Sequence, residues 1–318
     1  MKFIKIPAPN FDLAMTLDSG QVFHWEKAGK GFVGTIGNVP VFVEQWGDSL
    51  RGRCGATAPK SSRRLQPGLI ANYFALDHPL EEICASFPDD PTMNAARLSC
   101  RGLRIIRQPG WECLATFICS SMKQVAHIRQ ISLALCRRFG ERRRINDHSI
   151  YTFPSAQQIA RASQEDLRKC ALGYRAKNLL ATARLVSSGA ANLDAWSALA
   201  DTDLREKLCS LPGVGPKIAN CVMLFAYERL RAFPIDVWIE RVLKQQYFPR
   251  KKKVTERQLR EFSETYFGEH GGYAQQYLFH HARMALRKSG VSRDSSIPLR
   301  AARNDKGRDA RTALRDPE

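Results

Sequence analysis

The sequence predicts an α+β protein in which an N-terminal antiparallel sheet domain precedes a mainly helical, two-part core with a helix-hairpin-helix. Short β-branched runs over residues 32–43, broken at Gly37-Asn38, predict a hairpin. Apolar residues at helical spacing prevail from about residue 73 to about 230. Within that region, Pro-Gly-Val-Gly at 212–215 separates two helical patterns and is too short and too glycine-rich for anything but a tight turn.

These changes of pattern suggest three segments of the chain. We expect a sheet domain with a junction helix over residues 1–100, a helical core over 101–287 and a basic, disordered tail over 288–318. A length of 318 residues is sufficient for two or three subdomains with cores of their own.

The charge balance favours a polyanionic partner. There are 49 lysines and arginines against 31 aspartates and glutamates, a net charge of +18. Such an excess binds polyanions well because neutralised phosphates release their counterions. Charge alone does not distinguish DNA from RNA or from an anionic membrane.

Composition also bounds the cellular setting and the chemistry. No apolar run of membrane-spanning length occurs and no signal-peptide core follows Met1, so we expect a soluble, intracellular protein that resides with its polyanion. The nine cysteines are scattered without a Cys-x-x-Cys pair, which favours neither a zinc site nor a disulfide framework. We therefore expect no metal and no cofactor.

The turn at 212–215 is a candidate anion site. Gly213 and Gly215 allow the backbone to turn and to approach a partner closely. The following helix begins with N–H groups that have no partner inside the helix, and these suit a DNA phosphate. Together with Val214, the two glycines form the predicted phosphate site.

Two ionisable residues follow this turn. Lys217 falls in the first turn of the second helix, where the helix dipole disfavours a protonated amine, and an uncharged lysine can act as a nucleophile. The alternative is a solvated lysine that makes one more phosphate contact. Asp236 follows an apolar approach and precedes a new helical pattern, so it is a candidate for proton transfer and charge stabilisation, for a helix N-cap, or for both.

These motifs resemble a known superfamily. Leu-Pro-Gly-Val-Gly-Pro-Lys at 211–217 and Phe-Pro-Ile-Asp-Val at 233–237 are similar to the helix-hairpin-helix, Gly/Pro-Asp DNA glycosylases. Leu-x-Ser-Gly-Gln-x-Phe-x-Trp at 17–25 and Tyr-Phe-x-Leu-Asp at 73–77 resemble the eukaryotic-type 8-oxoguanine DNA glycosylase/AP lyases. The resemblance runs from about residue 10 to 285, with its motifs in the expected order.

The resemblance implies a bifunctional enzyme of base excision repair that flips 8-oxoguanine out of double-stranded DNA and excises it. It also implies a monomer and a helical glycosylase core. Some superfamily members hold an iron–sulfur cluster on four closely spaced cysteines near the C-terminus. Because the last cysteine here is Cys221, we expect no such cluster.

Residue roles follow from the same resemblance. Lys217 would attack C1′ and form a Schiff base that permits β-elimination, with Asp236 assisting. The backbone carbonyl of Gly20 would accept a hydrogen bond from the N7–H that distinguishes 8-oxoguanine from guanine. The rest of the lesion pocket would comprise Cys221 and Phe279 on the two faces of the base, Gln275 at its Watson–Crick edge, and Phe225 where the family has a methionine.

The residues facing the opposite base depart from the family pattern. Met122 replaces an asparagine that fills the gap left by the flipped base, and His127 replaces an arginine that contacts cytosine. Neither can reproduce a bidentate contact, so we expect relaxed discrimination of the opposite base. Tyr174 resembles the wedge that kinks the duplex, and Arg175 the second cytosine contact. Without the resemblance, these two residues would be a helix terminus with a glycine cap.

One further departure is Trp238, which stands where the family has a phosphate-binding histidine. Two alternatives remain open: a superfamily member that excises alkylated bases or oxidised pyrimidines, and a non-catalytic helix-hairpin-helix DNA-binding protein. Lys217 argues against a monofunctional alkyl-base enzyme, and the presence of both Lys217 and Asp236 argues against a mere binder. Whether Lys217 can be trapped on DNA discriminates between them.

Overall fold

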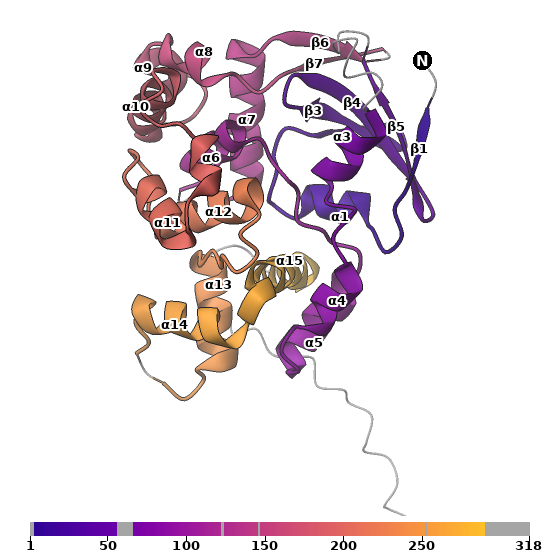
Figure 1. Ribbon diagram of the computed structural model, residues 1–318, viewed down its shortest axis with the longest axis vertical. Helices are drawn as coiled ribbons and strands as arrows, with labels where there is room; N and C mark the ends of the chain where they lie inside the picture. The colour runs from indigo at the N-terminus through magenta and orange to yellow at the C-terminus, as the bar shows by residue number, and fades with distance from the viewer. Residues whose placement is uncertain (1–2, 56–65, 122–123, 146, 252, 290–318) are drawn as a thin grey trace, which may run out of the picture.

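The computed structural model describes residues 3–55, 66–121, 124–145, 147–251 and 253–289 (Figure 1). Met122 and the predicted tail beyond residue 289 lie outside the described residues. Among the helices that are described, none combines the length and the apolar character needed to cross a membrane.

The N-terminal part is the predicted antiparallel sheet. Its five strands lie in the order β1-β5-β4-β3-β2, and all pairs are antiparallel. The predicted hairpin is confirmed, because Ile36 pairs with Val39 across a two-residue loop at Gly37-Asn38. The strands are β1 (Ile4–Pro7), β2 (Glu26–Ala28), β3 (Gly31–Ile36), β4 (Val39–Trp46) and β5 (Ser49–Cys54).

Helices α1 (Leu13–Asp18) and α3 (Gln66–Tyr73) complete this part of the molecule. Their apolar side chains share a core with the sheet, in which Trp25 and Phe74 are buried. The Trp25 indole N–H donates to the Tyr73 hydroxyl over 3.0 Å. Burial of two large aromatic side chains against the sheet fixes the segment that follows α1, which carries Gly20.

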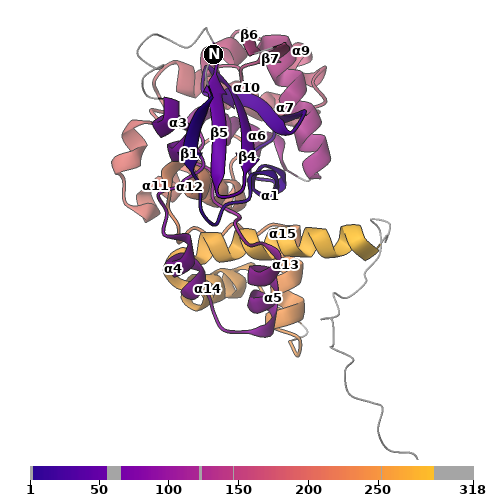
Figure 2. The same ribbon diagram turned by 90° about the vertical axis from the view of Figure 1, so that its right-hand side faces the viewer.

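The remaining helices share one large core of buried side chains. In Figures 1 and 2, one group (α6 to α12) lies beside the sheet, and a second group (α4, α5, α13, α14 and α15) lies below it, with the long α15 running beneath the first. These helices are α4 (Leu80–Ala85), α5 (Pro91–Ser99), α6 (Gly110–Cys119), α7 (Val125–Phe139), α8 (Ala156–Ala160), α9 (Gln164–Arg168), α10 (Arg175–Ser187), α11 (Asp201–Cys209), α12 (Pro216–Tyr227), α13 (Val237–Val242), α14 (Glu256–Tyr266) and α15 (Gly271–Ser289).

One element was not predicted. Within the predicted, mainly helical region, residues 142–151 form a hairpin of β6 (Arg142–Ile145) and β7 (His148–Tyr151) beside β3 and β4 (Figure 1). Three successive arginines give no alternation of apolar and polar residues from which a strand can be predicted. Ile145 and Ile150 hold the hairpin, because their side chains are buried against β3 and β4.

The predicted helix-hairpin-helix is present as α11 (Asp201–Cys209), a tight turn and α12 (Pro216–Tyr227). Gly213 adopts a φ of +81°, and a Cβ there would lie 2.7 Å from the Cβ of Asn178. A side chain at this position would be strained and would collide with α10, so the turn requires glycine.

Candidate active site

Lys217 is the second residue of α12, and α6 supplies its surroundings. Its ammonium nitrogen donates to the Ser120 hydroxyl over 3.2 Å and lies 5.2 Å from the centroid of the Phe117 ring. One turn further along α12, Cys221 is buried beside it. Burial raises the pKa of the Cys221 thiol to about 11, against the opposing charge of Lys217. Cys221 therefore remains a neutral thiol at neutral pH.

Asp236 is the N-cap of α13, as one of the two predictions for it required. Its Oδ1 accepts hydrogen bonds from the amides of Trp238 over 3.0 Å and of Ile239 over 2.8 Å. Burial nevertheless raises the pKa of its carboxyl above the ordinary value. The capping amides and the positive charges of Lys217 and Arg283 oppose that rise. The carboxylate thus both caps a helix and interacts with the lysine.

Two stacked rings lie next to the lysine. Phe225 of α12 and Phe117 of α6 are stacked with ring centroids 5.5 Å apart and an interplanar angle of 9°. Because Phe117 also contacts the Lys217 ammonium group, the two rings pack next to the candidate nucleophile. Phe225, predicted as a pocket residue, is buried, and the Phe117 ring contacts both Phe225 and the Lys217 ammonium group.

Gly20 lies against α15, although 259 positions separate it from Phe279 (279 − 20). Its φ is +89°, and a Cβ at this position would lie 3.1 Å from Phe279 Cε1 and 3.2 Å from Val125 Cγ2. A side chain there would be strained and would press on both neighbours, so only glycine suits the position. The structure therefore brings the predicted Gly20 and Phe279 together in one wall.

Gln275, also on α15, has an unsatisfied acceptor. Its side chain is buried, with 4% of its surface exposed, and its Oε1 has no hydrogen-bond partner among the described residues. A buried polar atom without a partner is costly, typically about 1–3 kcal/mol. Such an atom is accounted for when a bound ligand supplies the missing donor.

Comparisons with known proteins identify the family of this chain. The family model of the 8-oxoguanine DNA glycosylase N-terminal domain matches residues 3–114, and that of the HhH-GPD superfamily of base excision DNA repair proteins matches residues 115–265. The N-glycosylase/DNA lyase OGG1 of Arabidopsis thaliana is 31% identical over 87% of this chain and 78% of its own length. This chain belongs to that family. It is a DNA glycosylase with lyase activity, and its partner is DNA.

Two further relatives extend the likeness over nearly their whole length. The probable N-glycosylase/DNA lyase of Methanothermobacter thermautotrophicus is 30% identical and is matched over 96% of its sequence. The Clostridium acetobutylicum 8-oxoguanine glycosylase/lyase, solved with double-stranded DNA that contains cytosine opposite 8-oxoguanine, superposes with a TM-score of 0.80 at 27% identity. The alignment covers 89% of this glycosylase/lyase and 98% of that chain.

The predicted opposite-base residues of the glycosylase/lyase differ in accessibility. Tyr174, at the start of α10, is 62% exposed, and its ring lies under the Arg175 guanidinium at 4.3 Å. Arg175 is only 5% exposed, and its Nε donates to the Ser121 carbonyl over 2.8 Å and its Nη1 to the Leu172 carbonyl over 3.3 Å. His127 is exposed on α7. The exposed tyrosine suits a wedge, whereas the arginine is engaged with the backbone.

In the predicted phosphate site, one backbone amide is already used in a hydrogen bond within the turn. The Val214 amide donates to the Leu211 carbonyl over 3.1 Å, so this N–H supports the turn and does not face a phosphate. Gly215 is the N-cap of α12. Because glycine has no side chain, no side chain caps the amides in the first turn of this helix. Trp238 donates its amide to Asp236, and its ring lies 5.4 Å from the Arg241 guanidinium.

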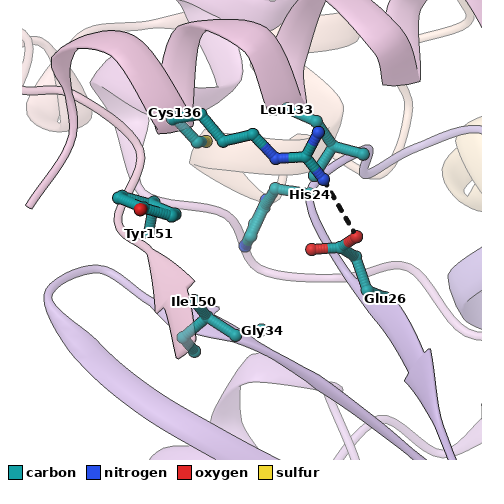
Figure 3. Close-up of a pocket in the computed structure, with 8 residues that line it drawn as sticks. His24, Glu26, Gly34, Leu133, Cys136, Ile150 and Tyr151 are labelled. Carbon is teal, nitrogen blue, oxygen red and sulfur yellow. Dashed lines mark ion pairs between the residues drawn. The ribbon is translucent and has the colours of Figure 1, made fainter. Parts of the chain in front are cut away.

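His24 and Glu112 form a buried pair between the N-terminal segment and α6. His24 Nδ1 lies 3.1 Å from Glu112 Oε1, and the other ring nitrogen of His24 lies 2.8 Å from the Thr35 carbonyl. Figure 3 shows His24 in the small pocket between the sheet and α7, next to the ion pair of Glu26. Burial raises the pKa of the Glu112 carboxyl, and His24 opposes this rise. The pair joins the segment after Gly20 to α6.

Three residues that contribute to the site were not predicted. Ser120 accepts from Lys217, Gln276 donates to the Ser19 carbonyl over 3.0 Å, and Arg283 lies beside Phe279. Ser120 lies two positions before Met122 and Gln276 directly after Gln275, and the sequence analysis assigned neither of them a role. Arg283 is four positions after Phe279, a spacing that places both on one helix face and was the available signal.

Proposed function

We propose that this glycosylase/lyase excises 8-oxoguanine flipped out of double-stranded DNA, with Lys217 as nucleophile and Asp236 as the assisting carboxylate. The observation that carries the proposal is the packing of Gly20 against Phe279, together with the unsatisfied Oε1 of Gln275 one turn earlier on the same helix. The Watson–Crick edge of a guanine-type base carries N–H donors, and one of them can supply the hydrogen bond that Gln275 Oε1 lacks in the free protein. Among oxidised purines, 8-oxoguanine adds the N7–H that the Gly20 carbonyl can accept.

The chemistry requires an uncharged Lys217. Its nitrogen attacks C1′ while the glycosidic bond breaks, and the bonding electrons leave with the base, which takes up a proton. The nitrogen then loses one proton, and the C1′–O4′ bond breaks as the ring oxygen takes up a proton, which leaves a protonated Schiff base on the opened sugar. Removal of a C2′ proton then expels the 3′ phosphate. The ionised Asp236 stabilises the positive charge that develops on the sugar in the first step.

The remaining predicted residues fit a supporting role in this proposal. Cys221 and Phe279 would hold the two faces of the base, and the exposed Tyr174 would fill space in the duplex. The departures at Met122 and His127, and the engagement of Arg175 with the backbone, support relaxed discrimination against bases other than cytosine. Gly213, Gly215 and Trp238 would contact phosphates, and the enzyme would act as a monomer.

The test uses a duplex with a single 8-oxoguanine placed in turn opposite each of the four bases, and a duplex with guanine as control. The native protein is expected to release the base and to give a borohydride-trapped adduct. Lys217→Gln should bind the duplex and give no adduct, with base release reduced by about 10³-fold or more. Lys207→Gln is the matched control, since this exposed lysine lies on the other helix of the same hairpin.

Two results would contradict the proposal. Release from the 8-oxoguanine duplex no faster than from the guanine duplex would exclude this lesion as the substrate. An adduct that persists in Lys217→Gln would exclude Lys217 as the nucleophile. Equal release opposite all four bases would agree with relaxed discrimination, whereas a strong preference for cytosine would overturn that part.

A further inference from the structure

Arg283 lies one turn beyond Phe279 on α15 and meets several parts of the pocket wall. Its Nη1 donates to the Asp18 carbonyl over 3.1 Å. Its guanidinium carbon lies 5.4 Å from the centroid of the Phe279 ring. The same Nη1 would lie 3.1 Å from a Cβ placed on Gly20. The half-buried guanidinium is therefore packed into the junction between the end of α1 and the aromatic face of α15.

We propose that Arg283 is a specificity-determining positioning residue, which holds the Gly20 carbonyl and the Phe279 ring in the mutual orientation that recognises the lesion. The proposal rests on the proposed function and deepens it. It assigns to α15, besides Gln275 and Phe279, the task of fixing the N-terminal segment against the base.

Two consecutive carbonyls before Gly20 are held from the same helix. Arg283 binds the Asp18 carbonyl, and Gln276, two turns earlier on α15, donates to the Ser19 carbonyl over 3.0 Å. With these two peptide groups fixed, the next carbonyl, that of Gly20, has little freedom. Recognition of a single N–H by a single carbonyl depends on such restriction, because a misplaced acceptor loses the hydrogen bond.

An arginine suits this position better than other side chains. Its planar guanidinium can lie against an aromatic ring and still donate in its own plane to a carbonyl. A lysine ammonium is a point donor without that planar contact, and a neutral side chain of similar length lacks both the donor and the charge. Substitutions at this position therefore separate the donor geometry from the charge.

The charge of Arg283 also acts on the catalytic carboxylate. Asp236 faces Lys217 and the neutral thiol of Cys221 from α12, Arg283 from α15 and the capping amides of its own helix. The positive charge of Arg283 opposes the rise in the pKa of Asp236 that burial causes. Without this charge the pKa of Asp236 would rise further, so a smaller fraction would be ionised at acidic pH. The acidic limb of the activity profile would then move to higher pH.

The experiment compares Arg283→Met and Arg283→Lys with the native chain in single-turnover base release from 8-oxoguanine and guanine duplexes across pH. In Arg283→Met, the preference for 8-oxoguanine over guanine is expected to fall about tenfold, and the acidic limb should move to higher pH. Arg283→Lys should keep the acidic limb of the native protein while losing part of the preference. Arg260→Met, at an exposed position on α14, is the control for loss of one positive charge.

The possible outcomes separate this inference from the proposed function. If native protein releases 8-oxoguanine and Arg283→Met keeps both the native preference and the native limb, the role of Arg283 is overturned. If native protein releases only another damaged base, the proposed function fails. The variants are then measured on that base, where an unmoved limb in Arg283→Met would overturn the inference and a moved limb would support it. Should Arg283→Met not fold, Arg283→Lys decides through its preference alone, since native preference in that variant contradicts the role.

Discussion

The proposed lesion-pocket side and the proposed opposite-base side of this glycosylase/lyase use their polar groups differently. On the pocket side, Gln275 buries an acceptor without a described partner, and burial keeps the pKa of Asp236 above its ordinary value. On the opposite-base side, Arg175 donates to backbone carbonyls of its own chain. The pocket therefore has interactions left for a ligand, whereas the other side has used its strongest donor for its own stability.

This difference connects recognition with stability. Groups that await a ligand destabilise the free protein slightly, and their removal costs binding. Groups engaged with the backbone stabilise the free protein, and their removal costs folding. Substitutions on the two sides should accordingly have opposite signatures, and four predictions test this.

The largest effect is expected at Asp236. Asp236→Asn should lower the rate of base release by about 10²- to 10³-fold, because the developing positive charge on the sugar loses its counter-charge. Asparagine is a good N-cap, so α13 should remain capped. Measurement of single-turnover release with 8-oxoguanine duplex tests this, and a rate within threefold of the native one, on the order of the experimental scatter, would exclude the assigned role.

The same variant has a stability signature whose sign follows from linkage. The pKa of Asp236 is raised in the folded state, so the folded protein binds this proton more tightly than the unfolded chain does. Ionisation of Asp236 thus destabilises the native state at neutral pH, and this effect disappears once the pH falls below the unfolded value. Asp236→Asn should be the more stable protein at neutral pH and should lose that advantage in acid, as thermal unfolding at several pH values can show.

The second effect is expected at Arg175. Arg175→Met should lower the free energy of unfolding by about 1–3 kcal/mol, because the Ser121 and Leu172 carbonyls lose their donor. Tyr174→Ala is the matched control next to it, and its 62% exposure predicts a change of no more than about 0.5 kcal/mol. Denaturant unfolding measures both. Equal stability of the two variants would contradict the view that Arg175 is engaged with its own chain.

A smaller and opposite effect is expected at Gln275. Gln275→Leu removes a buried acceptor that has no partner among the described residues, so the free protein should be unchanged or more stable by up to about 1 kcal/mol. Affinity for the 8-oxoguanine duplex should nevertheless fall about tenfold. Unfolding of free Gln275→Leu measures the stability. Duplex affinity is measured with Gln275→Leu combined with Lys217→Gln, against Lys217→Gln alone, so that base release does not interfere. A destabilised free protein would mean that the Gln275 amide already has a partner.

The smallest effect is expected at His127, which is exposed on α7. His127→Ala should change neither stability nor base release opposite cytosine by more than about 0.5 kcal/mol. The reverse change, His127→Arg, should raise the preference for cytosine if this position faces the opposite base. Release rates opposite each of the four bases test both variants, and an unaltered ranking in His127→Arg would place the position away from that base.

Local sequence patterns were sufficient for much of the fold. The two-residue loop of the β3–β4 hairpin, the glycine turn between α11 and α12, and the cap at Asp236 all depend on residues close together in the chain. Their physical causes are a positive φ, a tight turn and a side chain that accepts from nearby amides, and these are short-range. The β6–β7 hairpin was missed because its burial depends on β3 and β4, which lie about a hundred residues earlier.

By itself the sequence predicted which side chains carry the chemistry: the lysine after the glycine turn, the aspartate before α13 and the glutamine and phenylalanine of α15. Only the tertiary structure decided what each of them meets. The contacts of Gly20 with Phe279 and Arg283, and the hydrogen bond from Arg175 to the Ser121 carbonyl, join segments far apart in the chain. Such contacts depend on how separate elements pack, and packing leaves no periodic trace in any one segment.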